Sequence, residues 1–163
     1  MNEKSLIRKD LRARVRGLSP FGKAAAAAAL CQKLAADERT RRARSIGVFL
    51  PLSDEPDLRP WLHAVAEGGQ TPLAVPVEEN GVWEFRRLGE GGRPVPTAEL
   101  DLILVPGLGF TRAGDRLGRG KGIYDRLLAD YRGHARGIAF ACQEVPALPR
   151  EPHDVRLAEV WFG

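Results

Sequence analysis

The chain has 163 residues, of which 44% are hydrophobic and 28% are charged, which is typical of one soluble globular domain. No apolar run approaches the about 20 residues that a transmembrane helix needs, and the first residues lack the apolar core of a secretory signal. Cys31 and Cys142 are far apart and fit no metal-ligand spacing, so we expect buried free thiols in a cytoplasmic protein.

The net charge of +4 is unevenly distributed along the chain. Residues 1–44 contain twelve lysines and arginines but four acidic residues, so this segment carries +8 and the remainder carries −4. A basic segment of this kind can bind nucleic acid, form a solvated helix face, or supply a few side chains to an anionic ligand. The solvated face is the simplest of these three interpretations, and composition alone leaves all three open.

The first predicted element is an amphipathic helix over residues 4–17. Leu6, Leu11 and Val15 recur near helical spacing, with lysines and arginines between them, and Gly17 follows as a stop.

A second helix follows almost at once. Ser19 is a favourable N-terminal cap, and Pro20 then occupies the first helical position. The alanine run at 24–29 extends this helix, because alanine is the best helix former, and we expect it to end before the basic cluster at 39–44.

The rest of the chain alternates apolar runs with helical segments. Strands are predicted at 45–50, 72–77, 82–87, 102–105, 137–142 and 155–161, and helices at 58–67 and 123–131. Asn80-Gly81 predicts a hairpin between the second and third strands, and residues 89–99 read as a mobile loop. This order predicts a single α/β domain over 1–163, a three-layer sandwich with a mostly parallel central sheet and helices on both faces.

The segment after the strand at 102–105 carries the clearest functional pattern. It reads GDRLGRGKGIYD, so glycines alternate with Arg116, Arg119 and Lys121 directly before a predicted helix. Glycine lets phosphate oxygens approach the backbone, and a helix start adds free amides and a dipole, so we expect an anion site for phosphate. The loop is not a Walker A motif, because Asp115 and Gly122 stand where that motif needs glycine and a hydroxyl residue. The alternative is a flexible connection.

These residues also resemble a known family. LILVPGLGF followed by GDRLGRGKGIYDRLL is similar to the signature of the 5-formyltetrahydrofolate cyclo-ligase family. Lys4 and Arg8 resemble the family's ATP-contacting helix, and FLPLSDEPD resembles the strand and loop that bring a glutamate, here Glu55, to the folate. IAFACQ and PREPHDVRL resemble its final strand and acidic loop.

The resemblance implies ATP-dependent closure of 5-formyltetrahydrofolate to 5,10-methenyltetrahydrofolate, with ADP and phosphate released. Arg119 and Lys121 would be catalytic by stabilising the transferred phosphoryl group. The ATP site would comprise Lys4, Arg8, Arg116, Leu117, Gly118, Arg119, Gly120, Lys121, Gly122, Ile123 and Tyr124. The folate site would comprise Leu50, Glu55, Gly120, Gly122 and Tyr124, and Mg²⁺ would bind Asp125 and Asp154.

Several of these residues also have purely structural interpretations. Lys4 and Arg8 could belong to a solvated face, and Glu55 to a solvated acidic turn. Asp125 could be a helix first-turn acid favoured by the dipole, and Asp154 an ordinary turn residue. Further, weaker candidates for the pocket are Phe110, Phe140 and Gln143.

Two other functions remain open at this stage. The segment at 88–100 is shorter than the family usually has, so a related protein that binds ATP but has different or no folate activity is an alternative. A nucleic-acid-binding module is less favoured, because Phe21 is the one aromatic residue in 1–44 and leaves no stacking platform. We expect a monomer that acts on a reduced folate, with no nucleic-acid or membrane partner.

Overall fold

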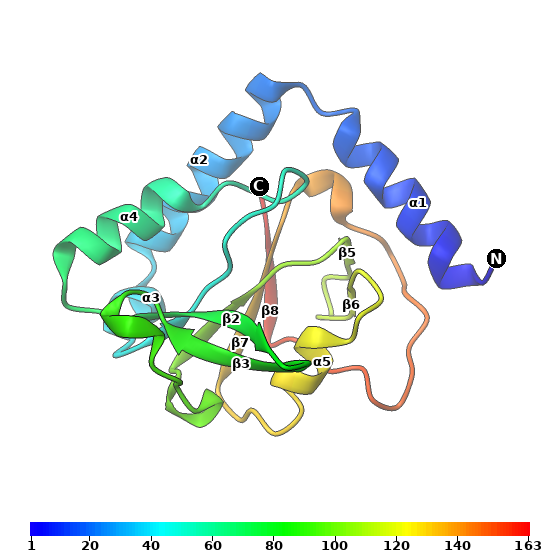
Figure 1. Cartoon of the computed structure of the whole chain (residues 1–163). Coiled ribbons are helices and arrows are strands. Elements are labelled where there is room, and N and C mark those ends of the chain that lie inside the picture. The colour runs from blue at the N-terminus through cyan, green and yellow to red at the C-terminus, as the bar shows by residue number, and fades with distance from the viewer.

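The computed structural model describes the backbone of residues 1–163 and every side chain except that of residue 90. Six strands form one sheet in the order β3-β2-β1-β4-β7-β8, and β5 and β6 form a separate two-stranded sheet (Figure 1). The strands are β1 Ile46–Gly47, β2 Leu73–Glu79, β3 Val82–Arg87, β4 Leu102–Val105, β5 Gly109–Phe110, β6 Arg116–Leu117, β7 His134–Ala139 and β8 Glu159–Phe162. The helices are α1 Glu3–Arg16, α2 Pro20–Ala36, α3 Glu38–Arg42, α4 Arg59–Gly68 and α5 Ile123–Leu127, with 3₁₀ turns η1 Glu90–Gly92, η2 Thr97–Glu99 and η3 Ala141–Gln143.

The main sheet is parallel except at one edge. β1 pairs in parallel with β2 and β4, and β7 pairs in parallel with β4 and β8, whereas β3 returns antiparallel to β2 through the turn at Asn80 and Gly81. The predicted α/β class with a mostly parallel sheet is therefore confirmed. The predicted hairpin is confirmed as well, since Asn80 and Gly81 both adopt the positive φ angles that this turn requires.

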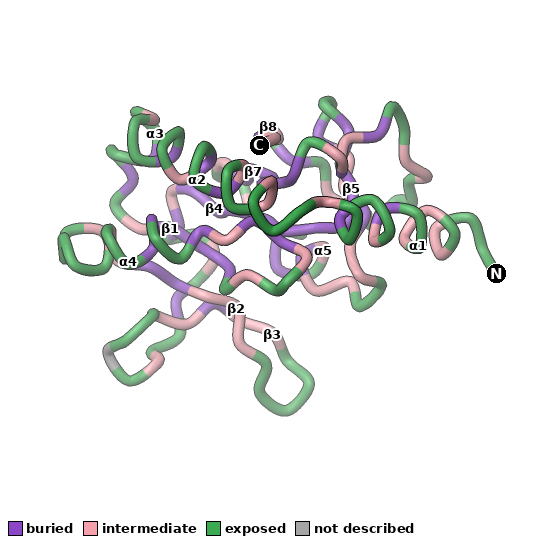
Figure 2. The backbone as a smooth tube through the Cα atoms, turned by 90° about the horizontal axis from the view of Figure 1, so that it is seen from above, coloured by how far each residue is buried: buried purple, intermediate pink, exposed green. Residues whose placement is uncertain are grey.

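Helices cover the main sheet on both faces. Alternate residues of β4 point to opposite sides, so Leu102 and Leu104 join one hydrophobic cluster while Ile103 and Val105 join another. The first cluster is closed by α2 and α4, and the second is closed by α5 and residues 95–100 (Figure 1). Buried backbone is concentrated around β1, β4 and β7, while the tip of the β2–β3 hairpin is exposed (Figure 2).

The first helix packs differently from its prediction. Ile7, Leu11 and Val15 form its inward stripe at four-residue spacing, and Leu6 is exposed. Leu11 packs with Leu117 and Val145, so α1 rests on the segments that follow β4 and β7 rather than on the main sheet. The second helix is capped as predicted, because the Ser19 hydroxyl accepts the Gly22 N–H at 2.9 Å.

Two predicted loops contain more structure than expected. The segment 106–122 is not a single open loop, since β5 and β6 pair within it. Residues 89–99 are likewise anchored, because Val95 is buried and donates its N–H to the Phe85 carbonyl at 2.8 Å. Both segments are short and rich in turn-forming residues, so their sequences show no recognisable strand pattern.

Other elements are shorter than predicted. The strand expected at 45–50 is reduced to β1, because the chain leaves the sheet toward the surface after Val48. The helix expected at 123–131 ends with α5 at Leu127. Cys31 and Cys142 are free, as predicted, but half-buried rather than fully buried. Among the described residues, no helix combines the length and apolar character needed to cross a membrane.

Candidate active site

A cavity of about 540 Å³ opens beside the carboxyl ends of β1 and β4. The chain passes from β1 to β2 on one side and returns to β4 on the other, so this is the crevice where α/β sheets bind ligands. All residues predicted to bind ATP, folate or metal line it, namely Lys4, Arg8, Leu50, Glu55, Arg116, Leu117, Gly118, Arg119, Gly120, Lys121, Gly122, Ile123, Tyr124, Asp125 and Asp154. The fold thus brings together residues from α1, the β1–α4 loop, the loop before α5 and the C-terminal segment.

The glycines of the loop serve two physical purposes. Gly120 and Gly122 have φ angles of +103° and +64°, a region that side chains rarely adopt. Gly118 instead makes room for a neighbour, because a Cβ there would lie 3.0 Å from the Arg116 guanidinium. Any larger residue at these three positions would therefore change the shape of the cavity wall.

Arg116 is held beneath this loop. Its Nε donates to the Pro106 carbonyl at 2.6 Å, and its guanidinium lies 5.0 Å from the centroid of the Tyr124 ring. Burial lowers the pKa of Arg116 and raises the pKa of Tyr124, which keeps the phenol neutral. The hydrogen bond to Pro106 thus fixes the position of the Arg116 guanidinium in the cavity wall.

Arg119 bridges the glycine loop and the acidic loop after β1. Its guanidinium donates to both Asp54 oxygens and to Glu55 Oε1, the last at 3.1 Å. Burial alone would lower the pKa of Arg119, but these hydrogen bonds outweigh it and raise the pKa. Burial would raise the pKa of Asp54, whereas its bonds to Arg119 lower it. Glu55 is buried and also accepts the Leu52 N–H at 2.9 Å, so its carboxylate is fixed in the cavity wall.

Two of the six basic residues of α1, Lys4 and Arg8, face the same cavity. Arg8 donates from Nε to the Gly118 carbonyl at 2.9 Å, and Lys4 Nζ lies 3.2 Å from carboxylate oxygens of Glu151 and Asp154. Burial would lower the pKa of Lys4, but the bonds to these two acids raise it. Both side chains lie on the inward face of the helix, so the interpretation of a purely solvated basic face is not needed for them.

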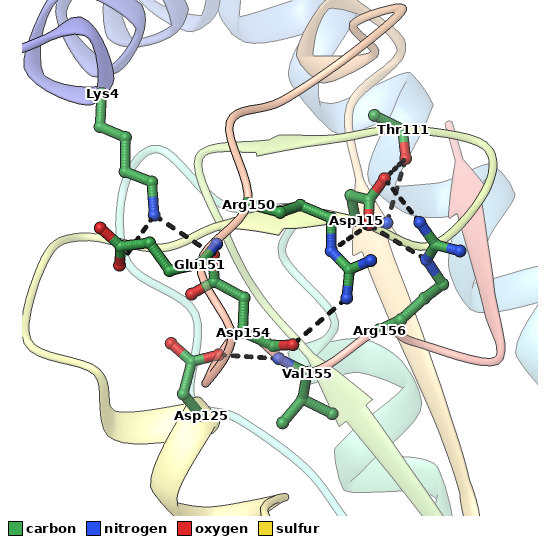
Figure 3. A network of polar contacts seen from close by, with 9 residues as sticks. All are labelled: Lys4, Thr111, Asp115, Asp125, Arg150, Glu151, Asp154, Val155 and Arg156. Atoms are coloured by element: carbon green, nitrogen blue, oxygen red, sulfur yellow. Dashed lines mark hydrogen bonds and ion pairs between the residues drawn. The ribbon is translucent and has the colours of Figure 1, made fainter.

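An acidic cluster at the cavity combines Asp125, just after the glycine loop, with His153 and Asp154 of the C-terminal segment. Ligand atoms of Asp125, His153 and Asp154 all lie within 4.8 Å of one another. Figure 3 shows two of these residues, Asp125 and Asp154. Burial would raise the pKa of Asp154, but the Glu151 N–H and the Lys4 ammonium outweigh it and lower the pKa. Two half-buried carboxylates beside a glycine- and arginine-rich loop fit Mg²⁺, which takes oxygen ligands and commonly uses one or two carboxylates with substrate phosphates.

Sequence reasoning missed the apolar wall of the cavity. It is formed by Phe49, which follows β1, and by Val75, Pro76 and Trp83 of the β2–β3 hairpin. Trp83 lies two residues after the Asn80-Gly81 turn and is half-buried, so an aromatic residue close to a hairpin turn was the available signal.

The weaker candidates for the pocket were wrong. Phe110, Phe140 and Gln143 are buried in the interior and do not line the cavity. Gln143 donates to the Gly107 and Leu108 carbonyls at 2.9 and 3.1 Å, so it supports the turn that carries the cavity wall.

The shorter α5 also changes one part of the anion-site argument. A helix of five residues has a small dipole, so its contribution at Gly122 is weaker than expected for 123–131. Attraction of an anion therefore depends mainly on the charged side chains of Arg8, Arg116 and Lys121.

The chain is similar to known proteins in both sequence and fold. Residues 74–163 match the sequence profile described as the 5-formyltetrahydrofolate cyclo-ligase family. The chain is 33% identical to the 5-formyltetrahydrofolate cyclo-ligase of Mycolicibacterium smegmatis, over 72% of each chain. It is 27% identical to the mouse (Mus musculus) enzyme of the same name, over 96% of this chain and 91% of the mouse protein.

A solved structure gives the same result for the fold. The 5,10-methenyltetrahydrofolate synthetase of Aquifex aeolicus superposes with a TM-score of 0.85 at 27% identity, covering 96% of this chain and 88% of that one. The profile match spans the glycine loop and the acidic cluster. It also spans β3, β4, β7 and β8 of the main sheet, and β2 except for Leu73. The chain described here therefore belongs to the 5-formyltetrahydrofolate cyclo-ligase family.

Proposed function

We propose that the cavity beside β1 and β4 binds ATP and 5-formyltetrahydrofolate together and joins them in the cyclo-ligase reaction. The observation that carries the proposal is the bridge formed by Arg119, which connects the glycine loop to Glu55 inside one cavity. A phosphate-binding segment and a buried carboxylate are thus in direct contact. Family membership supplies the reaction class, an ATP-dependent folate cyclo-ligase.

The chemistry requires the formyl oxygen to become a leaving group. The formyl oxygen attacks the γ-phosphorus of ATP, and the bond to the β–γ bridging oxygen breaks to release ADP. The nitrogen N10 of the folate then attacks the formyl carbon and loses its proton. Phosphate departs with the former formyl oxygen, which leaves 5,10-methenyltetrahydrofolate. Phosphoryl transfer of this kind depends on positioning and on cations more than on a nucleophilic side chain.

The charged residues divide between the two substrates. Arg8, Arg116, Arg119 and Lys121 would hold the phosphates, and Lys4 would reach them from α1. Arg119 and Lys121 would stabilise the charge that builds on the transferred group, because fixed cations in a partly buried site act strongly there. Glu55 would accept N–H donors of the pterin, and Leu50 would contact its ring.

The cluster Asp125, His153 and Asp154 would hold the divalent cation that accompanies ATP. When bound, Mg²⁺ neutralises phosphate charge and orients the phosphate oxygens. Asp154 already accepts Lys4 and the Glu151 N–H, so the chain orients this carboxylate before any ligand enters.

The proposal is tested by coupling two products in one assay. Purified protein with Mg²⁺-ATP and 5-formyltetrahydrofolate should release about one ADP for each methenyl-folate formed, and should release no ADP when the folate is omitted. ADP release that is independent of the folate would instead indicate an ATPase, and would contradict the proposed assignment of this cavity.

Replacing Glu55 with glutamine should weaken folate binding selectively. A hydrogen bond to a charged group contributes about 1.5–3 kcal/mol, so the KM for 5-formyltetrahydrofolate should rise by about 10- to 100-fold. The KM for ATP should change little. The matched control is Asp57→Asn, an acid of the same loop whose carboxylate pairs with Arg59 outside the cavity. An unchanged folate KM in Glu55→Gln would place the pterin elsewhere.

Replacing Asp125 with asparagine should raise the Mg²⁺ concentration needed for half-maximal rate. One of the two carboxylates loses its charge, so affinity for the cation falls by about tenfold or more, as for other metal-site substitutions. Asp130→Asn, an exposed carboxylate just beyond α5, is the control and should match the wild type. Equal Mg²⁺ requirements in both variants would remove Asp125 from the metal site.

We also propose that residues 1–163 act as one domain and as a monomer, in the cytoplasm. The support is that α1, both loops and the acidic cluster of the cavity all belong to a single chain. Sedimentation of the active enzyme at its assay concentration would test the monomer, and a larger species would contradict it.

A further inference from the structure

The metal-binding side of the cavity is carried by an irregular segment. Residues 150–156 contain no helix or strand, yet they present Glu151, His153 and Asp154 to the cavity. Within the segment, the Asp154 carboxylate accepts the Glu151 N–H at 2.7 Å, which forms a local turn. Something outside the segment must hold this turn against the cavity, because such segments open easily when few contacts fix them.

One carboxylate outside the cavity contacts both ends of that segment. Asp115 Oδ1 lies 3.1 Å from Arg150 Nε and 3.1 Å from Arg156 Nε (Figure 3). Its second oxygen, Oδ2, lies 3.4 Å from Arg156 Nη2 and 3.3 Å from the Thr111 hydroxyl. The two arginines flank the turn, so Asp115 joins the two ends of the segment. We call the contacts of Asp115 with Arg150 and Arg156 the clasp.

The clasp is itself fixed to the fold. Asp115 precedes β6, and its N–H donates to the Thr111 hydroxyl at 3.0 Å while the Thr111 N–H donates to its carbonyl at 3.0 Å. Thr111 is buried. The neighbouring Gly114 carbonyl accepts the Leu157 N–H at 2.9 Å, and a Cβ on Gly114 would lie 2.2 Å from the Leu157 carbonyl. The turn between β5 and β6 therefore packs closely against the C-terminal segment, and this close approach requires glycine at position 114.

Lys4 and Asp125 also hold the segment, the latter by accepting the Val155 N–H at 3.4 Å, but both lie on the ligand side. Lys4 holds it through its ammonium group, which contacts Glu151 and Asp154, the same carboxylates that a divalent cation and phosphates would approach. A bound cation at Asp154 competes with Lys4, because both need the same oxygens. Asp115 does not line the cavity, so its contacts persist when the cavity is filled.

We propose that Asp115 is a positioning residue that orders residues 150–156 and thereby aims Asp154 at the divalent cation. The effect on binding of the divalent cation rests on the proposed function, whereas the ordering of residues 150–156 by Asp115 does not. Asp115 also directly precedes Arg116, so one short segment places both the phosphate-binding loop and the metal-binding acids. The contacts join partly exposed arginines, so loss of the clasp should affect local order more than global stability.

The test compares Asp115→Asn with the wild type in two measurements. Amide hydrogen exchange of residues 150–157, measured without ligands, should accelerate by about tenfold in the variant. The Mg²⁺ concentration for half-maximal rate should rise by about tenfold, as for other residues that orient metal ligands, while the KM for 5-formyltetrahydrofolate stays unchanged. Asp115→Glu should restore part of both effects.

Two further variants complete the design. Arg156→Gln removes one partner from the opposite side and should reproduce both effects in weaker form. Asp101→Asn, which breaks an exposed pair with Arg44 far from the cavity, should match the wild type in both. Equal exchange of 150–157 in Asp115→Asn, Arg156→Gln and the wild type would overturn the clasp.

The two proposals can fail separately. A rise in the folate KM with an unchanged Mg²⁺ requirement would overturn the link between Asp115 and the metal. A wild-type protein that forms no methenyl product would refute the proposed function, and the exchange measurement would still decide whether Asp115 orders the segment.

Discussion

Replacing Arg119 with alanine should lower kcat by about 1,000-fold, because cations that stabilise a transferred phosphoryl group contribute on this scale. The guanidinium lies between the glycine loop and Glu55, where the proposed reaction joins ATP to the formyl oxygen. Steady-state kinetics on the purified variant would measure the effect. The KM for ATP should change by less than about threefold, because Arg8, Arg116 and Lys121 remain to bind the phosphates.

Two controls separate this effect from misfolding. Arg112→Ala removes an exposed arginine of the β5–β6 turn that pairs with Glu144 outside the cavity, and it should retain wild-type kcat. Calorimetry should show that Arg119→Ala still binds ATP. A kcat within about threefold of the wild type would contradict the role given to Arg119.

Replacing Arg136 with methionine should lower the free energy of unfolding by about 3 kcal/mol, as expected when one partner of a buried ion pair is removed. Arg136 lies on the interior strand β7 and is 1% exposed, although its side chain carries a charge. Its guanidinium donates to Thr40 and Asp37 at 3.0 and 3.1 Å and to Glu159, and it lies 3.8 Å from the Trp161 ring centroid. It therefore joins α3, β7 and β8.

Urea unfolding would measure the change, with Arg44→Met as the control. Arg44 makes the same kind of paired contact with Asp101, but at the surface, so its loss should leave the unfolding midpoint essentially unchanged. Equal midpoints for Arg136→Met and the wild type would show that the buried network contributes no net stability.

The same network predicts a pH dependence. Burial would raise the pKa of Asp37 and of Glu159, but hydrogen bonds, including those from Arg136, outweigh it and lower both. A carboxylate with a lowered folded-state pKa stabilises the fold above its unfolded pKa, about 4, and loses this contribution as pH falls through the folded value. The wild type should therefore lose more stability than Arg136→Met between about pH 5 and pH 2.

The place of the glycine- and base-rich loop was predictable because its signal is local. Glycines and bases alternate from Arg116 to Tyr124, between an apolar strand and a helix, so neighbouring positions indicate that the loop lines a cavity; that it binds phosphate stays a prediction. The helices at the N-terminus were predictable for the same reason, since Ser19, Pro20 and the alanine run have strong local preferences.

Features that depend on contacts between distant segments were not predictable in this way. The pairing of Arg119 with Asp54 joins residues 65 positions apart, and the contacts of Asp115 with Arg150 and Arg156 join the β5–β6 turn to the C-terminal segment. Charged residues in loops have many available partners, so composition does not select among them. Lys4 and Arg8 were assigned to the site through the family resemblance, and the inward face of α1 now provides the physical reason.

Short strands were missed because their patterns are too brief to recognise. β5 and β6 contain two residues each, within a segment rich in glycine and charge. Their pairing is stabilised by packing of Leu117 against Leu11 of α1 rather than by strand propensity. α5 is also shorter than its pattern predicts. After Leu128 the hydrogen bonds are those of turns, since the Ala129 N–H donates to the Arg126 carbonyl and the Tyr131 N–H to the Leu128 carbonyl.

The most direct test of this account is the absorbance of the methenyl-folate band after purified protein is mixed with 5-formyltetrahydrofolate and Mg²⁺-ATP. We predict that the band grows with the wild type, fails to grow when ATP is omitted, and grows about 1,000-fold more slowly with Arg119→Ala. Absence of growth with the wild type, under conditions where calorimetry detects bound ATP, would contradict the assignment of the cavity to folate cyclisation.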